Sequence, residues 1–134
     1  MKYEFIEHTA DIAIKAYGES VEESFGNAAK GMFDVISDIS KVEPVGEYEI
    51  SVKSDNLENL LVDWLGELLF LHETQELLFS EFDVKIENFS LMAKAKGEAI
   101  NREKHELRND VKAITYHMLE VNEKEGYVKL LLDI

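Results

Sequence analysis

A strand followed by the start of a helix can be recognised in residues 12–33, IAIKAYGESVEESFGNAAKGMF. Ile12, Ile14 and Ala16 recur at every second position, which is the spacing of one face of a β-strand. Gly18 ends this pattern, because glycine punctuates regular structure. The segment therefore predicts a strand that stops at a glycine and leads directly into a helix.

The predicted helix begins at a capping box. The Ser20 hydroxyl is placed to accept a hydrogen bond from an early helical N–H, while Glu23 reaches back toward the helix start. Apolar residues at helical spacing then predict an amphipathic helix over 21–38. These apolar residues are Val21, Phe25, Ala28, Ala29, Met32, Phe33 and Ile36. Residues 39–47, which contain the only proline, are expected to form a short connection.

The same order of strand, cap and helix recurs further along the chain. Residues 48–52 alternate as a strand, and Asp55 with Glu58 offers a second N-cap. A broad stripe of leucines around Trp64 predicts a second helix over 57–71, which we expect to be the more buried of the two. The repetition indicates duplicated strand–helix–strand units.

Antiparallel strands are predicted for most of the remaining chain. Alternating apolar residues predict a hairpin over 82–95, followed by two final strands, roughly 112–121 and 127–132. We therefore predict an α+β fold in which two helices pack on a mainly antiparallel sheet or open barrel. The length of the chain fits a single domain over residues 1–134.

Composition excludes several functional classes. With 46% hydrophobic residues the chain is not a disordered tail. It contains no cysteine, which excludes disulfides, iron–sulfur clusters, thiolate zinc sites and cysteine nucleophiles. Its first residues lack an apolar signal core, and no apolar run approaches the length of a membrane span. We expect a soluble, cytoplasmic protein without a membrane partner.

The net charge of −14 argues against strong direct binding to nucleic acid, because phosphate backbones would be repelled. Six basic and four acidic residues lie between Lys94 and Lys112, which makes one mixed, locally basic strip. An acidic body with such a strip fits a protein-binding module better than a nucleic-acid binder. A soluble acidic surface without a partner is the alternative.

Common catalytic and nucleotide-binding motifs appear only in incomplete form. Gly26 and Gly31 have the separation of a phosphate-binding loop, but Met32 stands where that loop needs lysine. The segment HELRN, which begins at His105, has asparagine in place of the second histidine of a zinc-protease helix. Neither segment therefore indicates an enzyme.

The most distinctive cluster of candidate residues involves the last two residues. Asp11 stands at the start of the predicted first strand, and Asp133 and Ile134 follow the apolar run LLL. If the last strand lies beside the strand that begins at Asp11, two carboxylate side chains and the terminal carboxylate converge. Such a group repels itself unless a cation lies within it. Oxygen ligands suit Ca²⁺, Mg²⁺ or Mn²⁺ rather than zinc. Separate acids on an exposed chain end are the alternative.

A second cluster consists of His105, Lys112, Tyr116 and His117. Residues 111–117 have a strand-like pattern, so Lys112 and Tyr116 should share one face and His117 should point to the other. From the pattern alone, a solvated strand surface is the favoured interpretation of these residues.

Five segments resemble the archease family, in family order and over essentially the whole chain. They are HTADIAIKAYG (8–18), SVEESFGNAAKGMF (20–33), LENLLVDWLGELLFL (57–71), AKGEAINREKHELRNDVKAITYHML (95–119) and LLLDI (130–134). The resemblance implies an α+β fold and an accessory protein of the RtcB-type RNA ligase, which joins tRNA halves. Such a protein would be no enzyme itself. It would promote transfer of GMP to the ligase histidine, support multiple turnover and broaden nucleotide use.

The resemblance also implies a divalent-metal site formed by Asp11, Asp133 and Ile134. Five further residues are candidates for supporting this site or contacting the ligase: His8, His105, Lys112, Tyr116 and His117. Delivery of the metal to the ligase and a purely conformational activation both agree with the sequence. A chaperone or modulator of RNA-processing proteins is an alternative function, and a metal-dependent phosphohydrolase is a second one.

Overall fold

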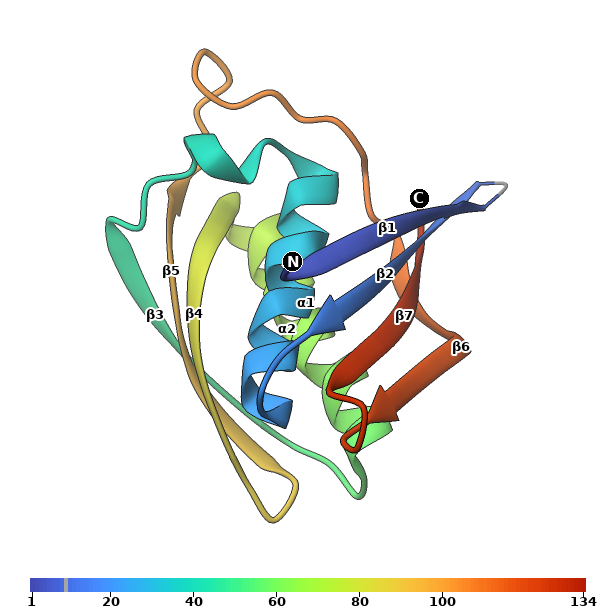
Figure 1. The fold of residues 1–134 in the computed structure, drawn as a ribbon. Helices are drawn as coiled ribbons and strands as arrows, with labels where there is room; N and C mark the ends of the chain where they lie inside the picture. Colours follow the sequence, from blue (N-terminus) through green and yellow to red (C-terminus); the bar gives the residue numbers. More distant parts are fainter. Residues whose placement is uncertain (9) are drawn as a thin grey trace.

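Two helices lie between two antiparallel sheets in the computed structural model (Figure 1). The structure describes residues 1–8 and 10–134, and for residues 7 and 8 it describes the backbone alone. The helices are α1 (Val21–Ile36) and α2 (Leu57–Gln75), and a short 3₁₀ helix, η1, spans Ile39–Lys41. No helix in the described part of the chain is long and apolar enough to cross a membrane.

The two sheets differ in where their strands come from. The four-stranded sheet joins both ends of the chain in the order β1-β2-β7-β6, and the three-stranded sheet has the order β3-β5-β4. The strands of the first sheet are β1 (Tyr3–His8), β2 (Asp11–Tyr17), β6 (Ala113–Asn122) and β7 (Tyr127–Asp133). Those of the second are β3 (Gly46–Lys53), β4 (Leu77–Glu87) and β5 (Ser90–Ala99). All neighbouring strands run antiparallel, and neither sheet closes into a barrel, which confirms the predicted α+β class.

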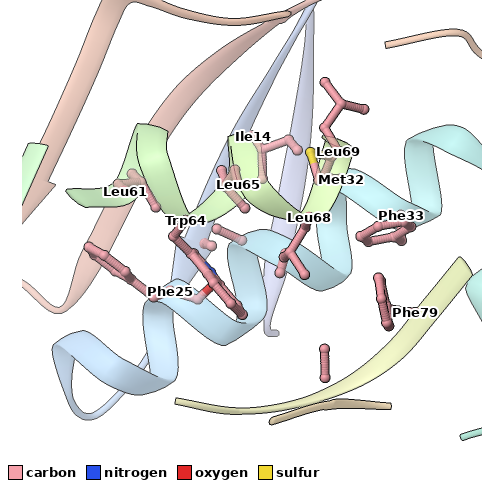
Figure 2. Packing of buried hydrophobic residues seen from close by; sticks show 14 of the residues in the cluster. Ile14, Phe25, Met32, Phe33, Leu61, Trp64, Leu65, Leu68, Leu69 and Phe79 are labelled. Atoms are coloured by element: carbon pink, nitrogen blue, oxygen red, sulfur yellow. The ribbon is translucent and has the colours of Figure 1, made fainter. Parts of the chain in front are cut away.

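One hydrophobic core fills the space between the sheets (Figure 2). Phe25 and Phe33 enter it from α1, Trp64 enters from α2, and Phe79 enters from β4. Burial of one such side chain contributes roughly 1.5–3 kcal/mol. The Trp64 indole N–H donates to the Phe25 carbonyl at 3.0 Å, so its polar atom is satisfied inside the core.

The two predicted caps had different outcomes. The Ser20 hydroxyl accepts from the Glu23 N–H at 3.0 Å, as predicted for α1. The cap of α2 is Asn56, whose side chain accepts from the Asn59 N–H at 2.8 Å, so the prediction of Asp55 was wrong by one residue. Both residue types cap helices well, and here Asp55 accepts from the Asn59 side chain instead.

The expected difference in burial between the helices was wrong. Helix α1 is the more buried, because it packs against the four-stranded sheet on one side and β4 on the other. Helix α2 leaves Phe70 exposed to 55%. Helix α1 also ends at Ile36 rather than 38, since Ser37 adopts an extended conformation.

The structure contains the predicted strands, but β4 begins at Leu77 rather than 82 and β5 ends at Ala99 rather than 95. The hairpin predicted over 82–95 is present as β4 and β5, and it turns at Asn88 and Phe89. The first strand, β1, was missed. The pairing of β6 with β7 is irregular between Thr115 and Glu120, and Met118 has a left-handed backbone there, with φ of 61°.

Candidate metal centre

The register between β2 and β7 places Asp11 directly opposite Asp133. Residues that face each other across antiparallel strands point to the same side of the sheet, with their Cβ atoms about 4.5–5.5 Å apart. The pairing of the last strand with the strand that begins at Asp11 is therefore present. We call Asp11, Asp133 and the main-chain carboxylate of Ile134 the carboxylate tip.

Main-chain hydrogen bonds fasten both sides of this tip. The Ile134 N–H donates to the Ala10 carbonyl at 3.4 Å, which brings the last residue back to the β1–β2 connection (Figure 1). On the other side, the Lys112 N–H donates to the Asp133 carbonyl at 2.8 Å. Ala10 has φ of 61°, a left-handed conformation that costs about 1–2 kcal/mol for a residue with a Cβ. Sequence reasoning missed Ala10, because alanine carries no signal for such a conformation.

The carboxylates of the tip are not neutralised within the described residues. Among those residues, no hydrogen bond or ion pair reaches the side chains of Asp11 or Asp133. Both residues are half-buried. Like charges directly opposite each other destabilise a sheet, so this pair has an electrostatic reason to take up a cation.

The donor set fits a hard divalent cation only if the main chain contributes. The described residues contain no group of three or more His, Cys, Asp or Glu side chains arranged to hold a metal. Asp11 and Asp133 supply two side chains, and a main-chain oxygen of Ile134, from its carbonyl or carboxylate, would be the third ligand, with water completing the oxygen shell. Such a site is open and all-oxygen, which suits Ca²⁺, Mg²⁺ or Mn²⁺.

The remaining predicted residues lie in different environments. Ala113 is also opposite Asp133, so the start of β6, with the exposed Lys112, adjoins the tip. Tyr116 and His117 are exposed but fall in the irregular part of β6, where the predicted alternation of faces no longer holds. The register pairs the His8 backbone with Asp11, and the His8 side chain lies outside the described part of the chain.

His105 is buried in the loop between β5 and β6, and both of its ring nitrogens are bonded there. Its Nδ1 atom accepts from the Asn101 N–H at 2.9 Å, and its Nε2 atom lies 3.0 Å from the Glu98 carboxylate. Because a backbone N–H can only donate, Nδ1 carries no proton, and Nε2 donates to Glu98. The imidazole is therefore neutral and held by its own loop, without a contact to the tip.

Glu98 organises this loop. Its carboxylate also accepts from the Glu43 N–H and from the Lys104 ammonium, each at 2.8 Å. Burial opposes ionisation of Glu98, but these hydrogen bonds outweigh it and lower its pKa to about 2. We call Glu98, Lys104, His105 and the Glu43 N–H the loop clasp. The preceding Gly97 lies so close to the Leu78 carbonyl that no Cβ fits, which allows β5 to carry Glu98 into this position.

A profile of the archease protein family (MTH1598/TM1083) matches residues 3–134. The chain belongs to the archease family. The matched range contains all five segments on which the resemblance was based.

Relatives and a solved structure extend this match over almost the whole length. Protein archease from Methanothermobacter thermautotrophicus is 44% identical over 98% of each chain. Protein archease from Sulfurisphaera tokodaii is 46% identical over 94% of this chain and 92% of its own length. The solution structure of Methanobacterium thermoautotrophicum protein 1598 is 44% identical, covers 99% of both chains and superposes with a TM-score of 0.85.

Proposed function

We propose that this member of the archease family is a non-catalytic accessory protein of an RtcB-type tRNA-splicing RNA ligase. In this proposal its carboxylate tip binds a divalent cation and acts at the ligase when GMP is transferred to the ligase histidine. Multiple turnover and wider nucleotide use of the ligase follow from easier GMP transfer. The observation that supports the tip most directly is the register that sets Asp11 opposite Asp133.

Each residue of the tip would supply an oxygen ligand to the cation. Asp11 and Asp133 come from neighbouring strands and supply two carboxylates on one face of the sheet, while the Ile134 carboxylate is held beside Ala10 by its N–H. A cation bound there would neutralise phosphate charge as the nucleotidyl group moves. The protein's own part is to hold three oxygen ligands at the end of a rigid sheet, where a partner can reach them.

The ligase protein, rather than its RNA, is the proposed contact. The chain carries 28 acidic and 14 basic residues, so its average field repels phosphates. We expect gel shifts with spliced and unspliced tRNA to show no tight, strongly salt-dependent binding by this protein alone.

The decisive experiment is a GMP-transfer assay on a purified RtcB-type ligase with limiting divalent metal. Substoichiometric wild-type protein should stimulate GMP transfer. Asp11→Asn and a one-glycine extension after Ile134 should fold normally and lose the stimulation, since the extension replaces a terminal carboxylate by a neutral amide carbonyl. Glu123→Gln, at an exposed position in the β6–β7 turn, serves as the matched control and should stimulate like the wild type.

Four outcomes would contradict parts of this proposal. Full stimulation by Asp11→Asn would remove the tip from the mechanism. Stimulation by the wild type that is equal at limiting and saturating metal would favour conformational activation without metal transfer. Hydrolysis of nucleotide without ligase would favour a phosphohydrolase, and protection of unrelated clients from aggregation would favour a chaperone.

A further inference from the structure

A groove between α2 and β3 lies apart from the carboxylate tip. Its volume is about 450 Å³, and it is lined by Val52, Lys53, Val62, Asp63, Gly66 and Glu67. The side chains of Val52 and Lys53 point to opposite faces of β3, because successive strand residues alternate. Because both residues line the groove, the groove reaches β3 itself and is not confined to one face of the sheet.

β3 is an edge strand, and its free side can accept another strand. In the order β3-β5-β4 it pairs only with β5. Alternate residues of an edge strand direct their N–H and C=O groups away from the sheet, where they can pair with an added chain. Peptide-binding domains of several kinds use a groove of this form, between a helix and an edge strand.

Gly66 forms the open floor of the groove without a structural reason inside this chain. Apart from its chain neighbours and the backbone of its own helix, no heavy atom lies within 4 Å of the position that a Cβ on Gly66 would take. Glycine in the middle of a helix is unfavourable relative to alanine, so a glycine that packs against nothing is unexplained by the free protein. Glycine on the floor of a groove allows the close approach of another backbone.

The charges around the groove define the occupant. Helix α2 carries four acidic residues and neither lysine nor arginine. Asp63 and Glu67 line the groove, and the exposed Phe70 lies one helical turn beyond Gly66 on the same side of α2. The two acidic residues outnumber Lys53 in the lining of the groove. An extended occupant that complements this surface directs cationic side chains toward Asp63 and Glu67 and brings its backbone close to Gly66, while its alternate, apolar side chains point to the other face.

We propose that the groove between α2 and β3 binds an extended segment of a partner protein in which lysine or arginine alternates with apolar residues. The segment adds to the free edge of β3, its backbone passes close to Gly66, and its cationic side chains pair with Asp63 and Glu67.

The test uses the full chain and a short capped peptide of alternating lysine and valine as the probe, followed by NMR titration and calorimetry. We expect amide shifts to concentrate at Val52, Gly66 and Glu67. Gly66→Leu fills the floor of the groove and should weaken binding by about tenfold or more, and Glu67→Lys should do the same. A peptide with glutamate in place of lysine should not bind.

Glu123→Lys is the matched control, because it makes the same change in net charge at an exposed residue that does not line the groove. It should alter peptide affinity far less than Glu67→Lys. If both charge reversals weaken binding equally, the peptide is attracted by the net charge of the protein rather than by the groove, and the proposal is overturned. Undiminished binding by Gly66→Leu, or shifts centred outside the groove, would overturn it as well. Because no ligase is present, the result is independent of the proposed activation.

Discussion

The carboxylate tip and the loop clasp both gather acidic groups, but they treat them in opposite ways. At the clasp, Glu98 receives hydrogen bonds from a main-chain N–H, an ammonium and an imidazole. At the tip, Asp11 and Asp133 face each other across two strands, and no described residue donates to their side chains. Glu98 thus has several donors among the described residues, whereas the facing pair at the tip has none among them and would gain from a bound cation.

Removal of the clasp carboxylate should have the largest effect on stability. Glu98→Ala should lower the free energy of unfolding by about 3 kcal/mol, because it leaves the buried His105 and the Glu43 N–H without their partner. Urea denaturation measures this change. Glu103→Ala, in the same loop with an exposed side chain, is the control and should stay near the wild type. A small loss in Glu98→Ala would mean that the clasp does not organise the fold.

Addition of a divalent cation should stabilise the tip and leave the clasp unaffected. A cation present at a hundredfold excess over its dissociation constant raises the free energy of unfolding by about 2.7 kcal/mol. Thermal melts with Ca²⁺, Mg²⁺ and Mn²⁺ should show this rise for the wild type and for Glu103→Ala. The rise should vanish in Asp133→Asn. If Asp133→Asn responds like the wild type, the cation binds elsewhere.

A fall in pH should lower the free energy of unfolding through protonation of Glu98 in the clasp. Its pKa in the folded protein is lowered from 4.5 to about 2, so the folded state keeps this carboxylate ionised after the unfolded chain has taken up a proton. The stabilisation is complete above the unfolded pKa and is lost as the pH falls from about 4.5 to about 2. Glu98→Gln should flatten the dependence of stability on pH in this window. An identical acid profile for both proteins would contradict the assignment.

The smallest change in the free energy of unfolding should come from a substitution at the tip in the absence of a cation. This change should be an increase, whereas loss of Glu98 from the clasp should cause a decrease. Asp11→Asn removes one of two facing charges, so the free energy of unfolding should rise by about 0.5 kcal/mol. Denaturation in the presence of a chelator measures it. A clear loss of stability would show that the Asp11 carboxylate has a structural partner.

Local patterns in the sequence predicted local structure well. Ser20 was correctly identified as a cap, and the hairpin over 82–95 was found, because both depend on residues close together in the chain. Strand β1 was missed because Phe5 and Ile6 are adjacent apolar residues that interrupt a simple alternation. The choice between Asp55 and Asn56 depends on backbone angles that neither side chain dictates.

Features that depend on residues far apart in the chain could be predicted only on the condition that particular strands pair. The sequence placed Asp11, Asp133 and Ile134 together if two strands paired, and the pairing itself depends on packing across the whole four-stranded sheet. The role of His105 could not be found in the same way. Residue type identifies an imidazole, but only the fold shows that Glu98 and the Asn101 N–H occupy both of its nitrogens.

The inner position of β7 has a consequence for the time course of synthesis. Residues 127–133 leave the ribosome after every other strand of the fold, yet they pair with both β2 and β6. Until then β1 and β2 can form only a two-stranded hairpin packed against α1, and two strands alone are marginal in water. The three-stranded sheet, built from residues 46–99, can assemble earlier. During translation the edge of β2 that pairs with β7 therefore stays unpaired until residues 127–133 emerge, and an unpaired strand edge exposes the nascent chain to aggregation.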